Sequence, residues 1–180
     1  MINIKNLTYQ IPNGNKIILD SINFKIWKGE FFGVLGKNGA GKSTLIDLLI
    51  GIRPPSEGEI EIFGEDPRFL SEQSRQKISF LSQDVKLPKH FRALDYLKYY
   101  GGFYQNFNYD MGKNLFDYFS VDRDAKIGSL STGQQNKVQI SATLASNSEI
   151  IFIDEVTAVL DPESRLKFFK ILENIRKRRE

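Results

Sequence analysis

Hydrophobic and polar residues in the first third of the chain follow patterns that are typical of β-strands. Apolar residues in the ranges 2–7, 17–27 and 31–35 predict three strands, and turn-forming residues separate them. Residues 59–63 alternate between glutamate and large apolar side chains with a period of two, which predicts a half-buried strand. We therefore expect the N-terminal part of the chain to be rich in β-structure.

The remainder of the chain combines helical periodicity with two short buried strands. Apolar runs at 78–81 and 150–153 predict these strands, and the first of them ends at Gln83. Residues 91–119 are rich in aromatic side chains and mostly helical, and Ser131 opens a helix that runs to about Ala145. Strands and helices in this arrangement predict an α/β protein.

The last helix has a clear start signal at Asp161-Pro162. Aspartate is a good N-cap residue, and proline fits the first helical position because its missing N–H has no intrahelical partner there. We expect the apolar face of this helix to consist of Leu166, Phe169, Leu172 and Ile175.

The composition is that of one ordinary globular domain. The chain has 180 residues, 41% of them hydrophobic and 26% charged, and we expect residues 1–180 to form a single domain. A formal net charge of +3 is too small to indicate direct binding to nucleic acid. Because the chain has no cysteine, disulfides and thiolate metal sites are excluded. No apolar run is long enough to cross a bilayer, so any role at a membrane requires a partner.

A glycine-rich run lies between the predicted strand at 31–35 and a helical pattern at 45–50. It reads Gly36-Lys37-Asn38-Gly39-Ala40-Gly41-Lys42-Ser43-Thr44 and matches G-x-x-x-x-G-K-[ST] in the strand–loop–helix context of a P-loop. In such a loop the backbone N–H groups point at phosphate oxygens, Lys42 reaches the β- and γ-phosphates, and the Ser43 hydroxyl binds Mg²⁺. A glycine-rich turn with an incidental lysine is the alternative, which the full motif in this context disfavours. The run predicts a nucleoside-triphosphate site.

Two carboxylates, Asp154 and Glu155, follow the predicted strand at 150–153. In P-loop ATPases such a strand places an aspartate near Mg²⁺, and a following glutamate can polarise the attacking water. A strand that ends in acids is also common on protein surfaces. The pairing with a P-loop favours the catalytic interpretation.

Residues 130–135, which read Leu130-Ser131-Thr132-Gly133-Gln134-Gln135, resemble the signature LSGGQ of the ATP-binding cassette (ABC) family. The resemblance covers essentially the whole chain. It implies an α/β P-loop NTPase fold with a mainly parallel core sheet, an N-terminal antiparallel β-subdomain and a small helical subdomain at about residues 86–146. Around residues 103–107 the chain is most similar to ATPase subunits of ABC-2-type exporters.

The resemblance also implies roles for individual residues. Tyr9 would stack on adenine, Gln83 would bind Mg²⁺ and water beside Ser43 and Asp154, and Glu155 would position the water. Residues 159–161 match the D-loop. Ser131, Gly133 and Gln134 start a helix, which is a natural anion site, and they would contact the ATP of a second subunit in a head-to-tail dimer.

Three of these residues have simpler interpretations. Tyr9 fits an ordinary strand aromatic, Gln83 fits a polar loop, and Ser131 alone fits an ordinary helix cap. His90 is the only histidine in the chain, and we expect it in a surface loop near the contact with a permease rather than at the phosphates.

The chain departs from the family pattern at two places. Val156 stands where the family usually has proline after the catalytic glutamate, and we expect it to loosen how Glu155 is held, with a modest effect on rate. The family has a later strand that ends in a switch histidine, and the chain ends at Glu180 before that point. We therefore expect a C-terminally truncated chain that binds ATP well and hydrolyses it poorly.

These features together predict the ATPase subunit of a membrane transporter, with export as the expected direction. Two such subunits, identical or different, would close around two ATP and Mg²⁺ and drive a separate integral-membrane permease from the cytoplasmic face of the membrane. The alternatives are a non-transport ABC-type ATPase that acts on ribosomes or DNA, and an ATP-binding module deficient in hydrolysis.

Overall fold

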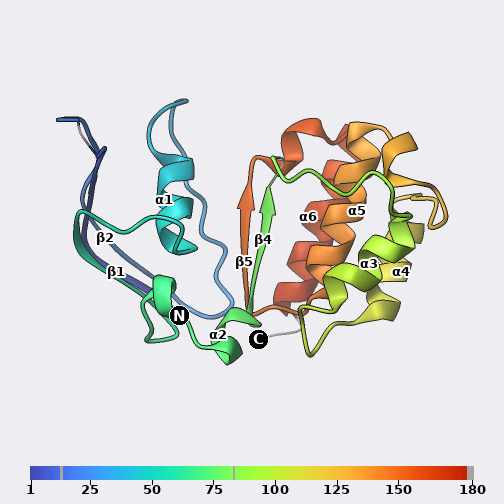
Figure 1. Ribbon diagram of the computed structural model, residues 1–180, viewed down its shortest axis with the longest axis horizontal. Coiled ribbons are helices and arrows are strands. Elements are labelled where there is room, and N and C mark those ends of the chain that lie inside the picture. The colour runs from blue at the N-terminus through green and yellow to red at the C-terminus, as the bar shows by residue number, and fades with distance from the viewer. Residues whose placement is uncertain (13, 83, 178–180) are drawn as a thin grey trace. The chain divides into compact units, whose positions relative to one another are not determined.

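The computed structural model describes residues 1–12, 14–82 and 84–177 (Figure 1). By its internal contacts the chain forms two compact units, Met1–Arg75 and Gln76–Arg179. The P-loop belongs to the first unit, and the two carboxylates and the signature belong to the second. Each unit is described separately.

The first unit is built on an antiparallel sheet of three strands in the order β2-β1-β3. Apolar side chains alternate with polar ones along the central strand, and Ile2 and Ile4 pair with Ile62 and Ile60 to form the buried face. The elements of this unit are β1 (Ile2–Gln10), β2 (Ile17–Ile26), α1 (Lys42–Leu49), β3 (Glu57–Ile62), the short 3-10 helix η1 (Pro67–Phe69) and α2 (Glu72–Arg75). The predicted N-terminal β-subdomain is confirmed.

The strand predicted at 31–35 is wrong for this structure, which assigns no strand there. Phe32 stacks on Phe24 of β2 with ring centroids 4.6 Å apart, whereas Leu35 is 96% exposed. A strand is stable only when neighbouring strands satisfy its backbone. In the described part of the first unit the only paired strands are β1, β2 and β3, so an apolar pattern alone does not make residues 31–35 a strand.

The second unit combines two parallel strands with four longer helices. The strands β4 (Ile78–Ser82) and β5 (Ile150–Asp154) lie side by side, and Ser82 is the register partner of Asp154 (Figure 1). The other elements are α3 (Ala93–Gly101), α4 (Tyr109–Tyr118), η2 (Ile127–Ser129), α5 (Thr132–Ala145), η3 (Val156–Val159) and α6 (Pro162–Lys177). Parallel strands joined by helices confirm the α/β class.

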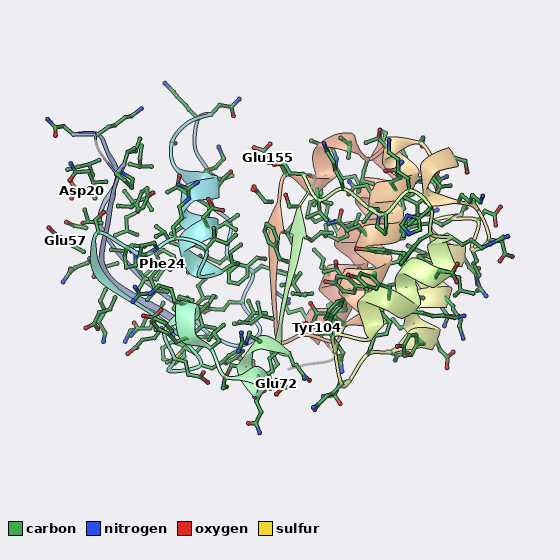
Figure 2. All side chains as sticks on the ribbon, viewed as in Figure 1. Asp20, Phe24, Glu57, Glu72, Tyr104 and Glu155 are labelled. Carbon is green, nitrogen blue, oxygen red and sulfur yellow. The ribbon has the colours of Figure 1, made fainter. Side chains whose placement is uncertain are left out.

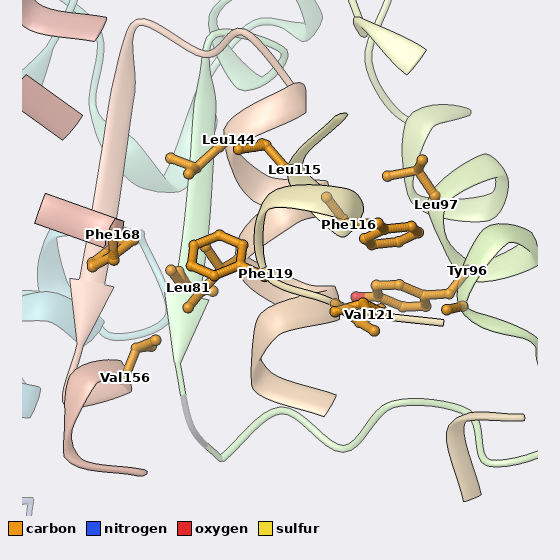
Figure 3. Packing of buried hydrophobic residues seen from close by; sticks show 14 of the residues in the cluster. Leu81, Tyr96, Leu97, Leu115, Phe116, Phe119, Val121, Leu144, Val156 and Phe168 are labelled. Carbon is orange, nitrogen blue, oxygen red and sulfur yellow. The ribbon is translucent and has the colours of Figure 1, made fainter. Parts of the chain in front are cut away.

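A single hydrophobic cluster holds the second unit together. Leu81 of β4, Phe116 of α4 and Phe119 just beyond it are fully or almost fully buried in this cluster (Figure 3). Val156, directly after Glu155, and Phe168 of α6 belong to the same cluster. Ile153, directly before Asp154, is partly buried and packs against this cluster, so the carboxylates lie between two residues that contact the core.

The apolar face predicted for α6 is only partly correct. Leu172 is buried as expected and Ile175 is partly buried, but Leu166 and Phe169 are exposed. The buried face instead follows Ser164, Phe168 and Leu172 at four-residue spacing. Because several apolar residues of α6 occur at helical spacing, two faces are possible from sequence, and packing on the core selects one of them.

Candidate functional site

The P-loop leads into α1 through a position, Gly41, where any side chain would be strained. Gly41 has φ +93° and occupies the N-cap position of the helix. A Cβ atom at Gly41 would lie 2.8 Å from Cγ2 of Ile18 in β2, which is closer than atoms approach. Both the left-handed conformation and the contact with β2 therefore require glycine here. This requirement explains one fixed position of the motif.

Lys42 is held inside the loop by backbone acceptors. Its ammonium group donates to the carbonyl of Gly36 at 3.0 Å and to the carbonyl of Lys37 at 3.1 Å. The ammonium group therefore bridges two backbone carbonyls of the loop. A phosphate bound in the loop would meet this ammonium group without a large movement of the side chain.

The backbone of the loop presents N–H donors that have no partner among the described residues. In the part of the chain that the structure describes, the amides of Gly39, Gly41, Lys42 and Ser43 donate no hydrogen bond. No side chain caps the start of α1. Unpaired N–H groups at a helix N-terminus form an anion site, because the helix dipole adds positive potential to the donors. The loop therefore fits a phosphate group.

In the second unit, two carboxylates lie at the C-terminal end of β5, and Figure 2 labels the second of them, Glu155. Asp154 is the last residue of the strand and is partly buried, and Glu155 follows it and is exposed. Glu155 adopts φ +51°, a left-handed conformation that is uncommon for residues other than glycine. Among the described residues no group of three His, Cys, Asp or Glu side chains could hold a metal ion. A metal at this site would need ligands of other kinds.

The residue after Glu155 is held firmly. Val156 is fully buried, and its carbonyl oxygen accepts a hydrogen bond from the side chain of Asn136 at 2.7 Å. Arg165 donates to the next carbonyl, that of Thr157, at 2.9 Å. We expected valine at 156 to loosen how Glu155 is held. The structure supplies packing and two side-chain hydrogen bonds that restrain this segment without proline.

The signature residues form the start of α5. The Ser131 hydroxyl caps the helix by accepting from the amide of Gln134 at 3.2 Å, as expected for a helix that Ser131 opens. The side-chain oxygen of Gln134 is buried and has no hydrogen-bond partner among the described residues. The side chain of Gln135 donates to the carbonyls of Ile127 and Leu130 and so fixes the segment that precedes the helix.

Asp161 joins α5 to the start of α6. Its carboxylate accepts from the amide of Ser164 at 2.8 Å and from the Ser164 hydroxyl at 2.7 Å. It also lies 3.1 Å from the ammonium group of Lys137, whose side chain is only 13% exposed. These hydrogen bonds hold the pKa of Asp161 well below its ordinary value, and the bond from the Ser164 amide has the largest effect.

Stability should therefore fall in acid partly through Asp161. The ionised carboxylate favours the folded state above its unfolded pKa of about 3.9, and this contribution is lost as the pH falls through that value and below. We expect the urea midpoint of the protein to drop between pH 5 and pH 3 more steeply than that of an Asp161→Asn variant. Equal slopes for the two proteins would contradict this role.

Three residues predicted from sequence have different outcomes. Tyr9 is only 5% exposed and its hydroxyl accepts from Arg53 at 3.2 Å, and its role in stacking on adenine stays a prediction. Gln83 lies outside the described residues. His90 is exposed in a loop, as expected, and its ring meets that of Phe91 edge to face.

Sequence reasoning missed the residues that support the site. Asn136, Lys137 and Arg165 contact the segment that follows Glu155, yet none of them belongs to a motif. For Asn136 and Lys137 one feature of the sequence could have indicated this role, since both directly follow the signature on the same helix.

Comparison with known proteins decides the family. The family model described as ABC transporter matches residues 19–158. The chain belongs to the ABC transporter family. This ABC ATPase domain therefore has the α/β P-loop fold that its signature, P-loop and strand-end carboxylates predict. No helix in the described ranges 1–12, 14–82 and 84–177 is long and apolar enough to cross a membrane.

Two curated relatives illustrate the range of this ABC family. The chain is 32% identical over 157 residues to the Nod factor export ATP-binding protein I of Sinorhizobium fredii, with 84% of this chain and 46% of that protein covered. It is 33% identical over 172 residues to the nucleoside import ATP-binding protein of Lactococcus lactis, with 90% of this chain and 34% of that protein covered. The chain thus spans about half, or less, of the length of these relatives.

Solved ABC structures share the fold. An ABC transporter ATP-binding protein from Pyrococcus furiosus has a TM-score of 0.83 and 29% identity, with 99% of this chain and 86% of that chain covered. An ATP-binding cassette solved as a dimer in a post-hydrolysis state, bound to ADP and Pi, also has a TM-score of 0.83, with 26% identity and coverage of 99% and 84%. The similarity extends over nearly the whole chain.

Proposed function

We propose that this protein binds and hydrolyses ATP as the ATPase subunit of an ABC membrane transporter. The observation that carries the proposal is the P-loop, which holds the ammonium group of Lys42 on two backbone carbonyls and has amides without a hydrogen-bond partner among the described residues. Positive charge and open donors in one loop are what a triphosphate requires. The family to which the chain belongs supports ATP as the ligand.

The proposed roles of the site residues follow from their chemistry. Lys42 and the amides of residues 36–44 would hold the phosphates, and Ser43, Gln83 and Asp154 would hold Mg²⁺, which would neutralise part of the phosphate charge. Mg²⁺ usually keeps few protein ligands and shares phosphate oxygens, which is consistent with the lack of an acidic cluster among the described residues. Glu155 would position and polarise the attacking water.

The signature points to a second subunit. Ser131, Gly133 and Gln134 lie at the N-terminus of α5, where the helix dipole favours an anion. We propose that these residues contact the ATP of the partner in a dimer, and the dimeric state of one solved relative supports this. ATP binding would then favour the closed dimer, and hydrolysis would release it.

An aromatic ridge on the second unit is the proposed contact with a permease. The rings of His90, Phe91, Tyr99 and Phe103 meet edge to face in sequence, with centroids 4.7, 5.6 and 5.2 Å apart. Tyr99 and Phe103 are exposed, and exposed aromatic side chains are typical of protein interfaces. The protein would then act at the cytoplasmic face of a membrane. Export is the proposed direction, although the two relatives described above include an importer.

Hydrolysis by a composite site has a distinctive concentration dependence. We expect the chain to release phosphate from Mg-ATP at a rate per subunit that rises with protein concentration, because a monomer lacks the partner's signature. Phosphate release measured between nanomolar and micromolar protein tests this. A protein that binds no ATP would overturn the proposal, and a rate per subunit independent of concentration would overturn the dimer. Co-purification with a membrane protein encoded beside this chain tests the permease contact.

A further inference from the structure

The first two turns of α5 run along the segment that follows Glu155. This segment begins with η3, a short 3-10 helix with few backbone hydrogen bonds of its own, in which Ala158 donates to Glu155 and Leu160 to Thr157. A Cβ atom at Gly133 would lie 3.5 Å from the carbonyl oxygen of Val159, so the start of α5 is in contact with the end of η3. A short 3-10 helix of this kind depends on its neighbours for its position.

Asn136 fixes the beginning of η3. Its side-chain amide is buried and donates to the carbonyl of Val156 at 2.7 Å. The orientation of this amide is determined, because turning it over would place its oxygen against the carbonyl oxygen. Val156 itself is fully buried in the hydrophobic cluster of the second unit (Figure 3). The residue directly after Glu155 is thus held by packing and by a buried hydrogen bond.

Lys137 fixes the other end of the same segment. Its mostly buried side chain pairs with Asp161 at 3.1 Å, and Asp161 in turn caps α6 through Ser164. Two consecutive residues of one helix therefore hold both ends of the stretch 156–161. Asn136 lies five positions after Ser131, about 7.5 Å along the helix axis, so the signature and these two side chains are carried by one rigid element.

We propose that Asn136 and Lys137 are positioning residues that fix the backbone of residues 156–161 and thereby the left-handed conformation of Glu155. Without these contacts η3 would move on the surface of α5, and the Glu155 carboxylate would lose its orientation. For hydrolysis this inference rests on the proposed function, since Glu155 is assigned there to the attacking water. The holding of residues 156–161 can be measured without nucleotide.

Hydrogen–deuterium exchange of the full chain tests the holding directly. In Asn136→Leu the Val156 carbonyl loses its side-chain donor, and we expect exchange of the peptide covering 155–161 to rise about tenfold. Lys137→Met should raise the exchange of this peptide as well, whereas Lys137→Arg should keep it at the level of the unaltered protein because the charge is retained. Gln135→Leu is the matched control, since its amide holds Ile127 and Leu130 instead. In that variant only the peptide before α5 should exchange faster.

The kinetic parameters distinguish a loss of Glu155 positioning from a general loss of ATP binding. For Asn136→Leu and Lys137→Met we expect kcat for ATP hydrolysis to fall about tenfold while KM for ATP stays within about twofold, because Glu155 acts on the water and not on binding. Unchanged exchange at 155–161 in both variants, or an equal rise in Gln135→Leu, overturns the inference. If Asn136→Leu does not fold, the comparison of Lys137→Met with Lys137→Arg tests the inference. Should the unaltered chain hydrolyse no ATP, the proposed function fails, and the exchange result still stands.

Discussion

Replacing Lys42 by alanine should weaken ATP binding by about a hundredfold, close to 3 kcal/mol at about 1.4 kcal/mol for each factor of ten. Hydrogen bonds to charged groups contribute about 1.5–3 kcal/mol each, and Lys42 would make such bonds with the phosphates. In the structure the same ammonium group joins the carbonyls of Gly36 and Lys37, so alanine also removes this bridge within the loop. Titration with a fluorescent ATP analogue measures the change.

Lys37→Ala is the matched control for Lys42. It removes a positive charge from the same loop but keeps the backbone carbonyl that Lys42 contacts, and the Lys37 side chain is exposed. We expect it to change ATP affinity by less than about threefold, since exposed charges contribute little. Equal losses in the two variants would show that overall charge, and not the position of Lys42, determines binding.

Glu155→Gln should lower kcat about a thousandfold, within the range of about 10²–10⁴ typical of a lost general base, and leave ATP binding intact. Glutamine has the same size, and the contacts that hold the next residue involve Asn136 and the buried Val156 side chain, which the change does not touch. Single-turnover hydrolysis together with the binding titration separates the two effects.

Glu149→Gln tests whether any lost carboxylate near β5 has the same effect. Glu149 precedes the opposite end of the strand and pairs with Lys77 on the surface at 3.6 Å. We expect kcat of Glu149→Gln to stay within about twofold of that of the unaltered protein, because surface ion pairs contribute about 0–1 kcal/mol. A large loss there, or a Glu155→Gln variant that still turns over at the normal rate, would argue against Glu155 as the base.

Local signals explain what could be predicted from the sequence. The starts of α5 and α6 were predicted at Ser131 and Asp161-Pro162 because capping depends on a side chain and the few amides that follow it. The P-loop was predicted for the same reason, since the Gly41 conformation and the Lys42 contacts lie within a few residues. For these features the neighbouring sequence contains the determining chemistry.

The misjudged features depend on distant parts of the chain. Whether residues 31–35 form a strand depends on a partner strand, which no property of those residues reveals. The hydroxyl of Tyr9 likewise meets a residue 44 positions later, Arg53, which the sequence around Tyr9 does not indicate. Similarly, Phe168 rather than Phe169 faces the core because α6 rotates to fit the hydrophobic cluster.

The exposed stretch at 31–35 has a consequence for handling the isolated chain. It contains Phe31, Phe32, Val34 and Leu35 without a charge or a proline, a composition that favours intermolecular β-pairing and aggregation. Charged residues lie on both sides of it, Lys28 and Glu30 before it and Lys37 after it, and such residues act as gatekeepers against aggregation. Solubility of the purified protein therefore depends on the charges that border this apolar stretch.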